Sequence, residues 1–154
     1  MSRNKNKWYE DKPSWLKNDE IHADPLADFV TTKNSLSVWR VEDNKSNLQR
    51  IIAALAAIRD RIDKLDYVLF DEKLLKECDI KVKLTEGNSP DQEANAWHYD
   101  LIELSAQKLV KLAETVWENQ PEADRIMPKK ARNWVAGAKE SGWLNPSKIR
   151  LKDL

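Results

Sequence analysis

The sequence predicts an α+β fold dominated by helices, with one small three-stranded sheet. The chain has 154 residues, of which 41% are hydrophobic and seven are Trp, enough for one hydrophobic core. Short segments with strand-like alternation stand between longer segments with helical periodicity. Only three glycines argue against an all-β sandwich, whose turns depend on Gly. We expect a polar N-terminus over residues 1–12, a single domain over 13–144 and a basic tail over 145–154.

Three segments predict the strands of the sheet. Residues 35–43 carry apolar side chains on both faces, which is typical of a strand covered on both sides. Residues 66–70 suit a short buried strand. Residues 79–84 alternate apolar residues with Lys81 and Lys83, which predicts an edge strand with one buried face. The first two strands and the helix between them are expected to form a right-handed β-α-β unit.

The clearest helix spans residues 46–65. Ser46 and Gln49 have the spacing of a capping box at its start. Apolar residues then repeat every seven residues, as in a coiled coil. This heptad stripe consists of Leu48, Ile51, Leu55, Ile58, Ile62 and Leu65. The stripe needs an apolar partner, and two remain open: a long helix of the same domain, or a second copy of the chain in a homodimer.

That long helix is predicted over residues 90–119. Ser89 stands in the N-cap position, Pro90 at the first helical position and Gln92 in the capping-box position, and together they favour a helix start. Pro121 ends it. Its apolar line is interrupted between Leu104 and Leu109, which predicts a bend or a change of packing partner.

Two further helices complete the prediction. A short one over residues 71–78 is capped by Asp71. The last one, over residues 128–142, begins at Pro128 and closes at Gly142, which suits a left-handed C-terminal cap.

Charge is balanced in total but uneven along the chain. Lys+Arg and Asp+Glu number 26 each, which argues against a protein that coats nucleic acid by bulk charge. Residues 85–124 nevertheless hold nine acidic residues against two lysines, whereas residues 128–154 hold seven basic residues against two acidic ones. In the simplest interpretation the final helix folds back on the acidic helix and the charges meet.

The leading functional hypothesis is a small accessory or inhibitor protein of a bacterium or phage, of the immunity or antitoxin kind. It would offer an acidic helical face to a basic macromolecule, as decoys for nucleic-acid-binding proteins do. The partner-binding residues of this hypothesis are Asp100, Glu103, Glu114 and Glu118.

The first alternative is a nucleic-acid-binding module that uses the basic C-terminal segment. Its cations would contact phosphates, and Trp134 and Trp143 would stack on bases, although both also suit core or cap positions. The predicted residues are Lys129, Lys130, Arg132, Lys148, Arg150 and Lys152.

The second alternative is a metal-dependent enzyme. The only two histidines both occur as His-x-Asp, at His22 and His98. Residues two apart diverge on a helix but share a side in an extended segment, so a site for Zn, Mn or Fe(II) would join His22, Asp24 and His98. In so acidic a chain a carboxylate near each histidine is expected by chance, which favours a hydrogen-bonded His98 without metal.

Other chemistry has no signature. The chain lacks Gly-x-Ser-x-Gly and a glycine-rich phosphate loop, and Cys78 is its only cysteine. We therefore expect no cofactor and favour a protein without enzymatic activity. Cys78 is predicted to lie in the core. The absence of disulfide pairs, of a secretory signal and of a long apolar run predicts a cytoplasmic protein without a membrane span.

Overall fold

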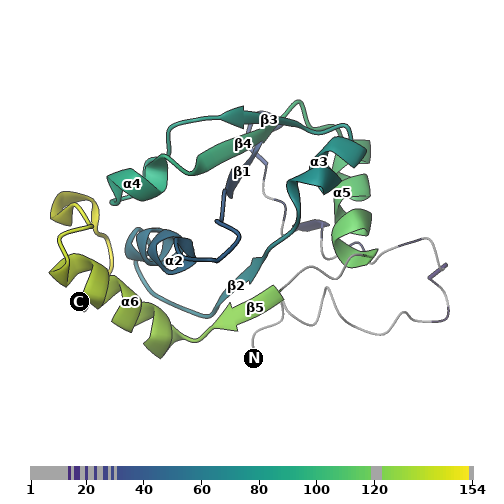
Figure 1. Ribbon diagram of the computed structural model, residues 1–154. Coiled ribbons are helices and arrows are strands. Elements are labelled where there is room, and N and C mark those ends of the chain that lie inside the picture. Colours follow the sequence, from purple (N-terminus) through teal and green to yellow (C-terminus); the bar gives the residue numbers. More distant parts are fainter. Residues whose placement is uncertain are drawn as a thin grey trace. The chain divides into compact units, whose positions relative to one another are not determined.

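The computed structural model confirms the α+β class (Figure 1). It describes residues 14, 16–17, 20, 23, 26–27, 29, 31–118 and 123–152, with the backbone alone at 118 and 123. The predicted polar N-terminus lies outside the described residues. Along the chain the elements are β1 (Leu36–Trp39), α2 (Leu48–Ala57), β2 (Leu65–Val68), α3 (Glu72–Glu77), β3 (Lys81–Leu84), α4 (Gln92–Asn95), β4 (His98–Ile102), α5 (Ala106–Glu118), β5 (Ala123–Ile126), α6 (Pro128–Glu140) and the 3-10 turn η2 (Pro146–Lys148).

The three-stranded sheet exists, but its membership differs from the prediction. Its order is β1-β4-β3, and β2 pairs with β5 in a separate two-stranded sheet. On one side of β4 the Arg40 N–H donates to the Trp97 carbonyl at 2.8 Å, and on the other the Thr85 N–H donates to the His98 carbonyl at 3.3 Å. Because β1 and β2 lie in different sheets, the expected β-α-β unit is wrong. The edge position of β3 is confirmed.

The exposure of β3 departs from its alternating sequence. Val82 is 40% and Leu84 62% exposed, so the predicted buried face of this strand is wrong. Ile80, just before the strand, is buried instead. The lysines do stand out to solvent as expected, and Lys81 pairs with Glu103.

The predicted long helix over 90–119 is wrong. It is replaced by the single turn α4, the central strand β4 and the separate helix α5. Asp91, not Ser89, caps α4, and its carboxylate accepts hydrogen bonds from the Glu93 and Ala94 N–H groups. The turn after β4 places Glu103 at φ 56°. The interruption in the apolar line before Leu109 thus marks the end of a strand rather than a bend in a helix.

Contacts divide the chain into two compact units. The first unit comprises residues 1–37, 66–83 and 100–124, and the second comprises 38–65, 84–99 and 125–154. In the first unit α3 packs against α5. Cys78 is buried there, as predicted, with its Sγ 3.3 Å from the Thr115 hydroxyl.

In the second unit α2 packs against α6 and, less extensively, α4 (Figure 1). The helix is shorter than predicted, and its N-cap is Asn47, so the Ser46 capping box is wrong. The buried Asn47 side chain instead accepts from the Glu42 N–H at 3.0 Å and donates to the Arg40 carbonyl at 3.1 Å. The helix that packs on α2 is therefore α6 rather than a long central helix, while Leu55 and Ile58 of the heptad stripe stay at least partly exposed.

The predicted ends of α6 are confirmed. Pro128 stands in its first turn, and Gly142 follows it at φ 71°. The Trp143 N–H donates to the Ala138 carbonyl at 2.9 Å and the Gly142 N–H to the Lys139 carbonyl at 3.0 Å, which is the Schellman pattern. This cap turns the chain back, and the segment after it packs along the same unit.

Candidate functional site

A largely buried ion pair joins two elements of the second unit. The Arg50 guanidinium on α2 makes two hydrogen bonds to the fully buried Asp91, Nε–Oδ2 at 2.5 Å and Nη2–Oδ1 at 3.0 Å. It also binds Glu93, and its Cζ lies 4.7 Å from the centre of the Trp143 ring. The hydrogen bond that Arg50 donates to Asp91 is the main cause that raises the pKa of Arg50, so the guanidinium stays charged. The pair joins α2 to the loop that opens α4.

The segment after α6 is anchored at two points of the same unit, one before α4 and one at the end of α2. The Asn145 N–H donates to the Pro90 carbonyl at 2.9 Å, and the Arg150 N–H donates to the Ala57 carbonyl at the end of α2 at 2.9 Å. Leu144 and Leu151 are buried. Residues 145–152, expected as a tail, are thus held by backbone hydrogen bonds and two apolar side chains.

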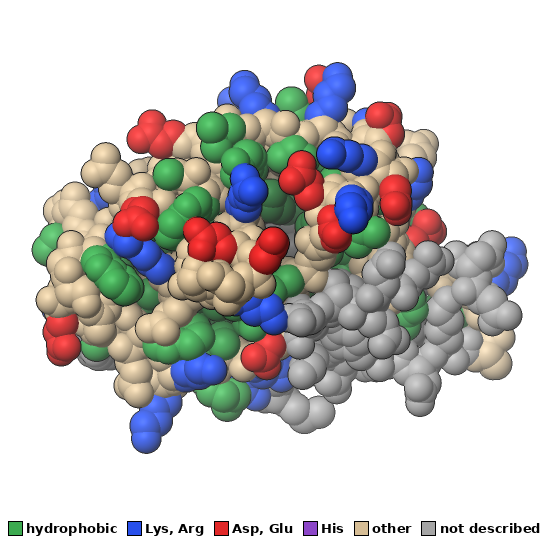
Figure 2. Space-filling view, in the orientation of Figure 1, with side chains coloured by type: hydrophobic (Ala, Val, Ile, Leu, Met, Phe, Trp, Pro, Cys, Tyr) green, Lys and Arg blue, Asp and Glu red, His purple; other side chains and the backbone are tan. Residues whose placement is uncertain are grey.

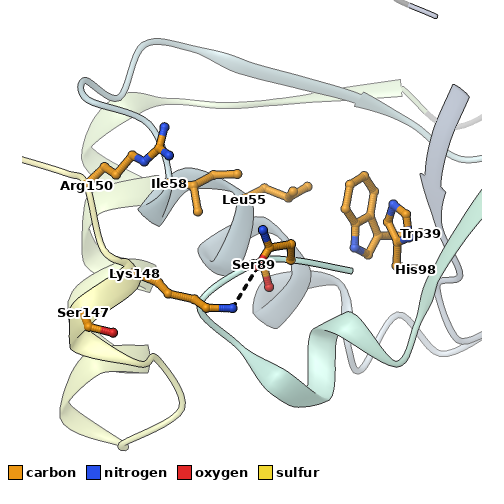
Figure 3. A pocket seen from close by; sticks show the side chains of 9 residues that line it. Trp39, Leu55, Ile58, Ser89, His98, Ser147, Lys148 and Arg150 are labelled. Carbon is orange, nitrogen blue, oxygen red and sulfur yellow. Dashed lines mark hydrogen bonds between the residues drawn. The ribbon is translucent and has the colours of Figure 1, made fainter. Parts of the chain in front are cut away.

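The anchored segment borders an open pocket of about 540 Å³ in the second unit. Figure 3 shows the side chains around it, which come from five separate stretches of the chain. They are Trp39, Leu55, Ile58, Asn88, Ser89, His98, Ser147, Lys148 and Arg150. We call it the cation–aromatic pocket.

The anchored segment supplies the cations of this pocket. Lys148 ends η2 and Arg150 follows after Ile149, and both side chains line the pocket. The Lys148 Nζ donates to the Asn88 Oδ1 at 2.9 Å, drawn as the dashed line in Figure 3. In the described part of the chain the Arg150 guanidinium has no carboxylate within ion-pair distance. This end of the pocket is positively charged.

The other end is aromatic. The Trp39 and His98 rings lie side by side in Figure 3, with centroids 4.7 Å apart at 69°. The His98 Nδ1 lies 2.9 Å from the Thr85 hydroxyl, which fixes the histidine and so supports the Trp39 ring. Between the two ends, Leu55 and Ile58 of α2 present apolar surface. Such an arrangement suits a ligand that has a flat or apolar body and a negatively charged group.

The six basic residues predicted from the sequence are all exposed. Lys129, Lys130 and Arg132 lie on α6, and the Lys130 Nζ stands 4.9 Å from the Trp134 ring. Lys148 and Arg150 line the pocket, and Lys152 follows them. In Figure 2 blue side chains project from the surface over α6, at the lower left. Within the described ranges none of the six has an acidic partner, so their charge is available to an outside anion.

The four predicted acidic residues do not share a helix. Asp100 lies on β4, where it accepts a hydrogen bond from the Ser37 hydroxyl at 3.0 Å. Glu103 lies in the following turn, and its hydrogen bond is the main cause that raises the pKa of Lys81. Only Glu114 and Glu118 belong to α5. The continuous acidic helical face expected from the sequence is therefore wrong, because the helix that would carry it is divided.

The metal hypothesis gains little from the structure. His22 and Asp24 lie outside the described residues. His98 is buried on β4 and hydrogen-bonded, and among the residues described no group of three or more His, Cys, Asp or Glu side chains could hold a metal ion. No described helix is long and apolar enough to cross a bilayer.

No protein-family model, curated protein or solved structure matches the chain. Sequence reasoning identified Lys148 and Arg150 but missed Trp39, Leu55 and Asn88. Each of these missed residues is unremarkable in its own segment, and only the fold brings them to the two cations.

Proposed function

We propose that this protein binds nucleic acid through the basic residues of α6 and the segment that follows it. The observation that carries the proposal is the exposure of Lys129, Lys130, Arg132, Lys148, Arg150 and Lys152, none with an acidic partner in the described part of the chain. Basic side chains that are not neutralised by their own protein attract phosphates and release counterions on binding.

The arrangement on α6 supports this proposal. Lys129 and Arg132 are three residues apart, and Lys139 is one heptad beyond Arg132, so the three cations lie along one exposed side of the helix. The adjoining side of the helix, with Ala131, Val135 and Ala138, is buried against the unit. Because the helix is already folded, this row of cations can contact a phosphate backbone without a further loss of backbone conformational entropy.

The acidic-face hypothesis has less support. Arg50 binds two of the nine acidic residues of 85–124, and Glu103 is paired with Lys81. Such neutralised carboxylates attract a basic partner weakly.

Binding of a labelled single-stranded oligonucleotide, measured by fluorescence anisotropy at increasing salt, tests the proposal. We expect log K to fall linearly with log salt, and the slope to shrink by about 0.7 for each phosphate contact removed. The variant Lys129→Ala/Arg132→Ala should therefore show weaker binding and a smaller slope. Lys83→Ala, which removes an exposed cation of the first unit, is the control and should leave both unchanged. Absence of binding at low salt would refute the proposal.

A further inference from the structure

The cation–aromatic pocket has more specific chemistry than the row of cations on α6. A phosphate backbone needs only positive charge, whereas this pocket also offers an aromatic ring and the apolar side chains of Leu55 and Ile58. Its volume of about 540 Å³ lies within the range of small-ligand sites. The order of the groups across the pocket is cation, apolar surface, aromatic ring (Figure 3).

We propose that this pocket binds one unpaired nucleotide, with the base against Trp39 and the phosphate at the end that Lys148 and Arg150 line. The inference rests on the proposed nucleic-acid binding and names the part of the ligand that the pocket takes. A base inside a duplex is stacked and paired, so it cannot enter. The pocket therefore makes the protein prefer single strands over duplexes.

The polar side chains of the pocket fit the same ligand. Asn88 holds Lys148 in place through its Oδ1, and the Ser147 hydroxyl on the cationic side donates to the Asn145 Oδ1 and keeps its oxygen as an acceptor. Inorganic phosphate would use the two cations but leave Trp39 and the apolar surface without a partner. An acidic peptide would meet the cations too, but a carboxylate side chain has no flat body to stack on Trp39.

The test compares two double variants that remove the same charge. Lys148→Ala/Arg150→Ala changes the pocket, and Lys129→Ala/Arg132→Ala changes only α6; all four side chains are exposed, so both proteins should keep the fold, as thermal melts would check. The probes are a single-stranded oligonucleotide, a hairpin duplex of the same composition, a free nucleoside 5′-monophosphate, inorganic phosphate, and polyglutamate as competitor.

We expect the pocket variant to lose the preference for single strand over duplex and to lose binding of the monophosphate. The α6 variant should weaken single-strand and duplex binding by the same factor. Trp39→Leu should weaken single-strand binding by about fivefold or more, while Trp39→Phe, which keeps a stacking ring, should retain most of it. Equal binding of oligonucleotides with and without a 5′-phosphate would place an internal nucleotide in the pocket, and a preference for the phosphorylated one would place the strand end there.

Other results overturn the inference while leaving the proposed function intact. These are equal effects of the two double variants on single strand and duplex, or binding of inorganic phosphate as tight as that of the monophosphate. Displacement of the oligonucleotide by polyglutamate at equal charge concentration would count against both proposals, because it would assign the cations to an acidic protein. Failure of every oligonucleotide to bind the unaltered protein at low salt would refute the proposed function itself.

Discussion

At the scale of single residues, the Arg50–Asp91 pair holds the second unit together. Arg50→Ala leaves the fully buried Asp91 carboxylate without its guanidinium, and we expect the free energy of unfolding to fall by about 3–5 kcal/mol. Glu93→Ala removes only the exposed partner of the same arginine and should cost less than about 1 kcal/mol. Denaturant titration of both variants measures the difference. Equal losses in the free energy of unfolding would contradict the idea that the burial of Asp91 makes this ion pair important for stability.

Gly87 offers a second test at the same scale. A Cβ added there would lie 2.8 Å from the Asn95 Oδ1, 3.0 Å from the Asn95 Cα and 3.1 Å from the His98 Cβ. Because one of these atoms belongs to the backbone, the neighbours cannot simply rotate away, and Gly87→Ala should destabilise the protein by about 1–3 kcal/mol. A chemical-denaturation midpoint equal to that of the unaltered protein would contradict this close approach.

Asp91 also shows what residue counting cannot predict. In the sequence it is one of nine acidic residues in 85–124 and contributes to an apparent acidic surface. In the fold it is a buried helix cap and the counter-ion of Arg50. The sequence does not show whether a carboxylate faces solvent or pairs with an arginine 41 residues away. The count of acidic residues in 85–124 therefore overestimates the number of exposed carboxylates.

At the scale of elements, prediction succeeded where local signals mark both ends. Asp71 caps α3, and Pro128 and Gly142 bound α6, all as expected. Prediction failed where one element gives way to another without a proline or glycine between them. Strand β4 begins only two residues after α4 ends, and the turn that follows β4 has Glu103 at positive φ. Strand β4 is defined by its hydrogen-bonded neighbours β1 and β3, which are distant in sequence.

The two glycines of the α6 region should respond in opposite directions. Nothing lies within 4 Å of a Cβ added at Gly137, inside the helix, so Gly137→Ala should stabilise the protein by about 0.5–1 kcal/mol. Gly142 has φ 71°, where a side chain is strained, so Gly142→Ala should destabilise it by about 1 kcal/mol. Thermal melts of the two variants measure both shifts. A gain in stability from both would mean that the Schellman turn is not formed in solution.

At the scale of the whole molecule, the candidate site could be predicted only in part. The basic composition of the last segment indicated Lys148 and Arg150. The aromatic end of the pocket depends on β1 and β4, and the apolar surface on the end of α2. These segments are distant in sequence and share no common residue pattern. No periodicity or spacing in the sequence could therefore predict that they line one pocket.

The chain passes from one unit to the other within its strands, which predicts how the two units unfold. The boundary between them falls inside each of the five described strands, after Ser37, Leu65, Lys83, Tyr99 and Asp124. Each of these strands has residues in both units, so unfolding of one unit removes part of every strand. We therefore propose that the two units unfold as one cooperative domain.

Two core variants test this cooperativity. Leu112→Ala in the first unit and Ile51→Ala in the second each remove a buried side chain and should cost about 2–5 kcal/mol. Because unfolding is shared, each variant should shift one and the same transition, whether it is followed by far-ultraviolet circular dichroism or by Trp fluorescence. Two separate transitions, each moved by only one of the variants, would instead make the units independent domains.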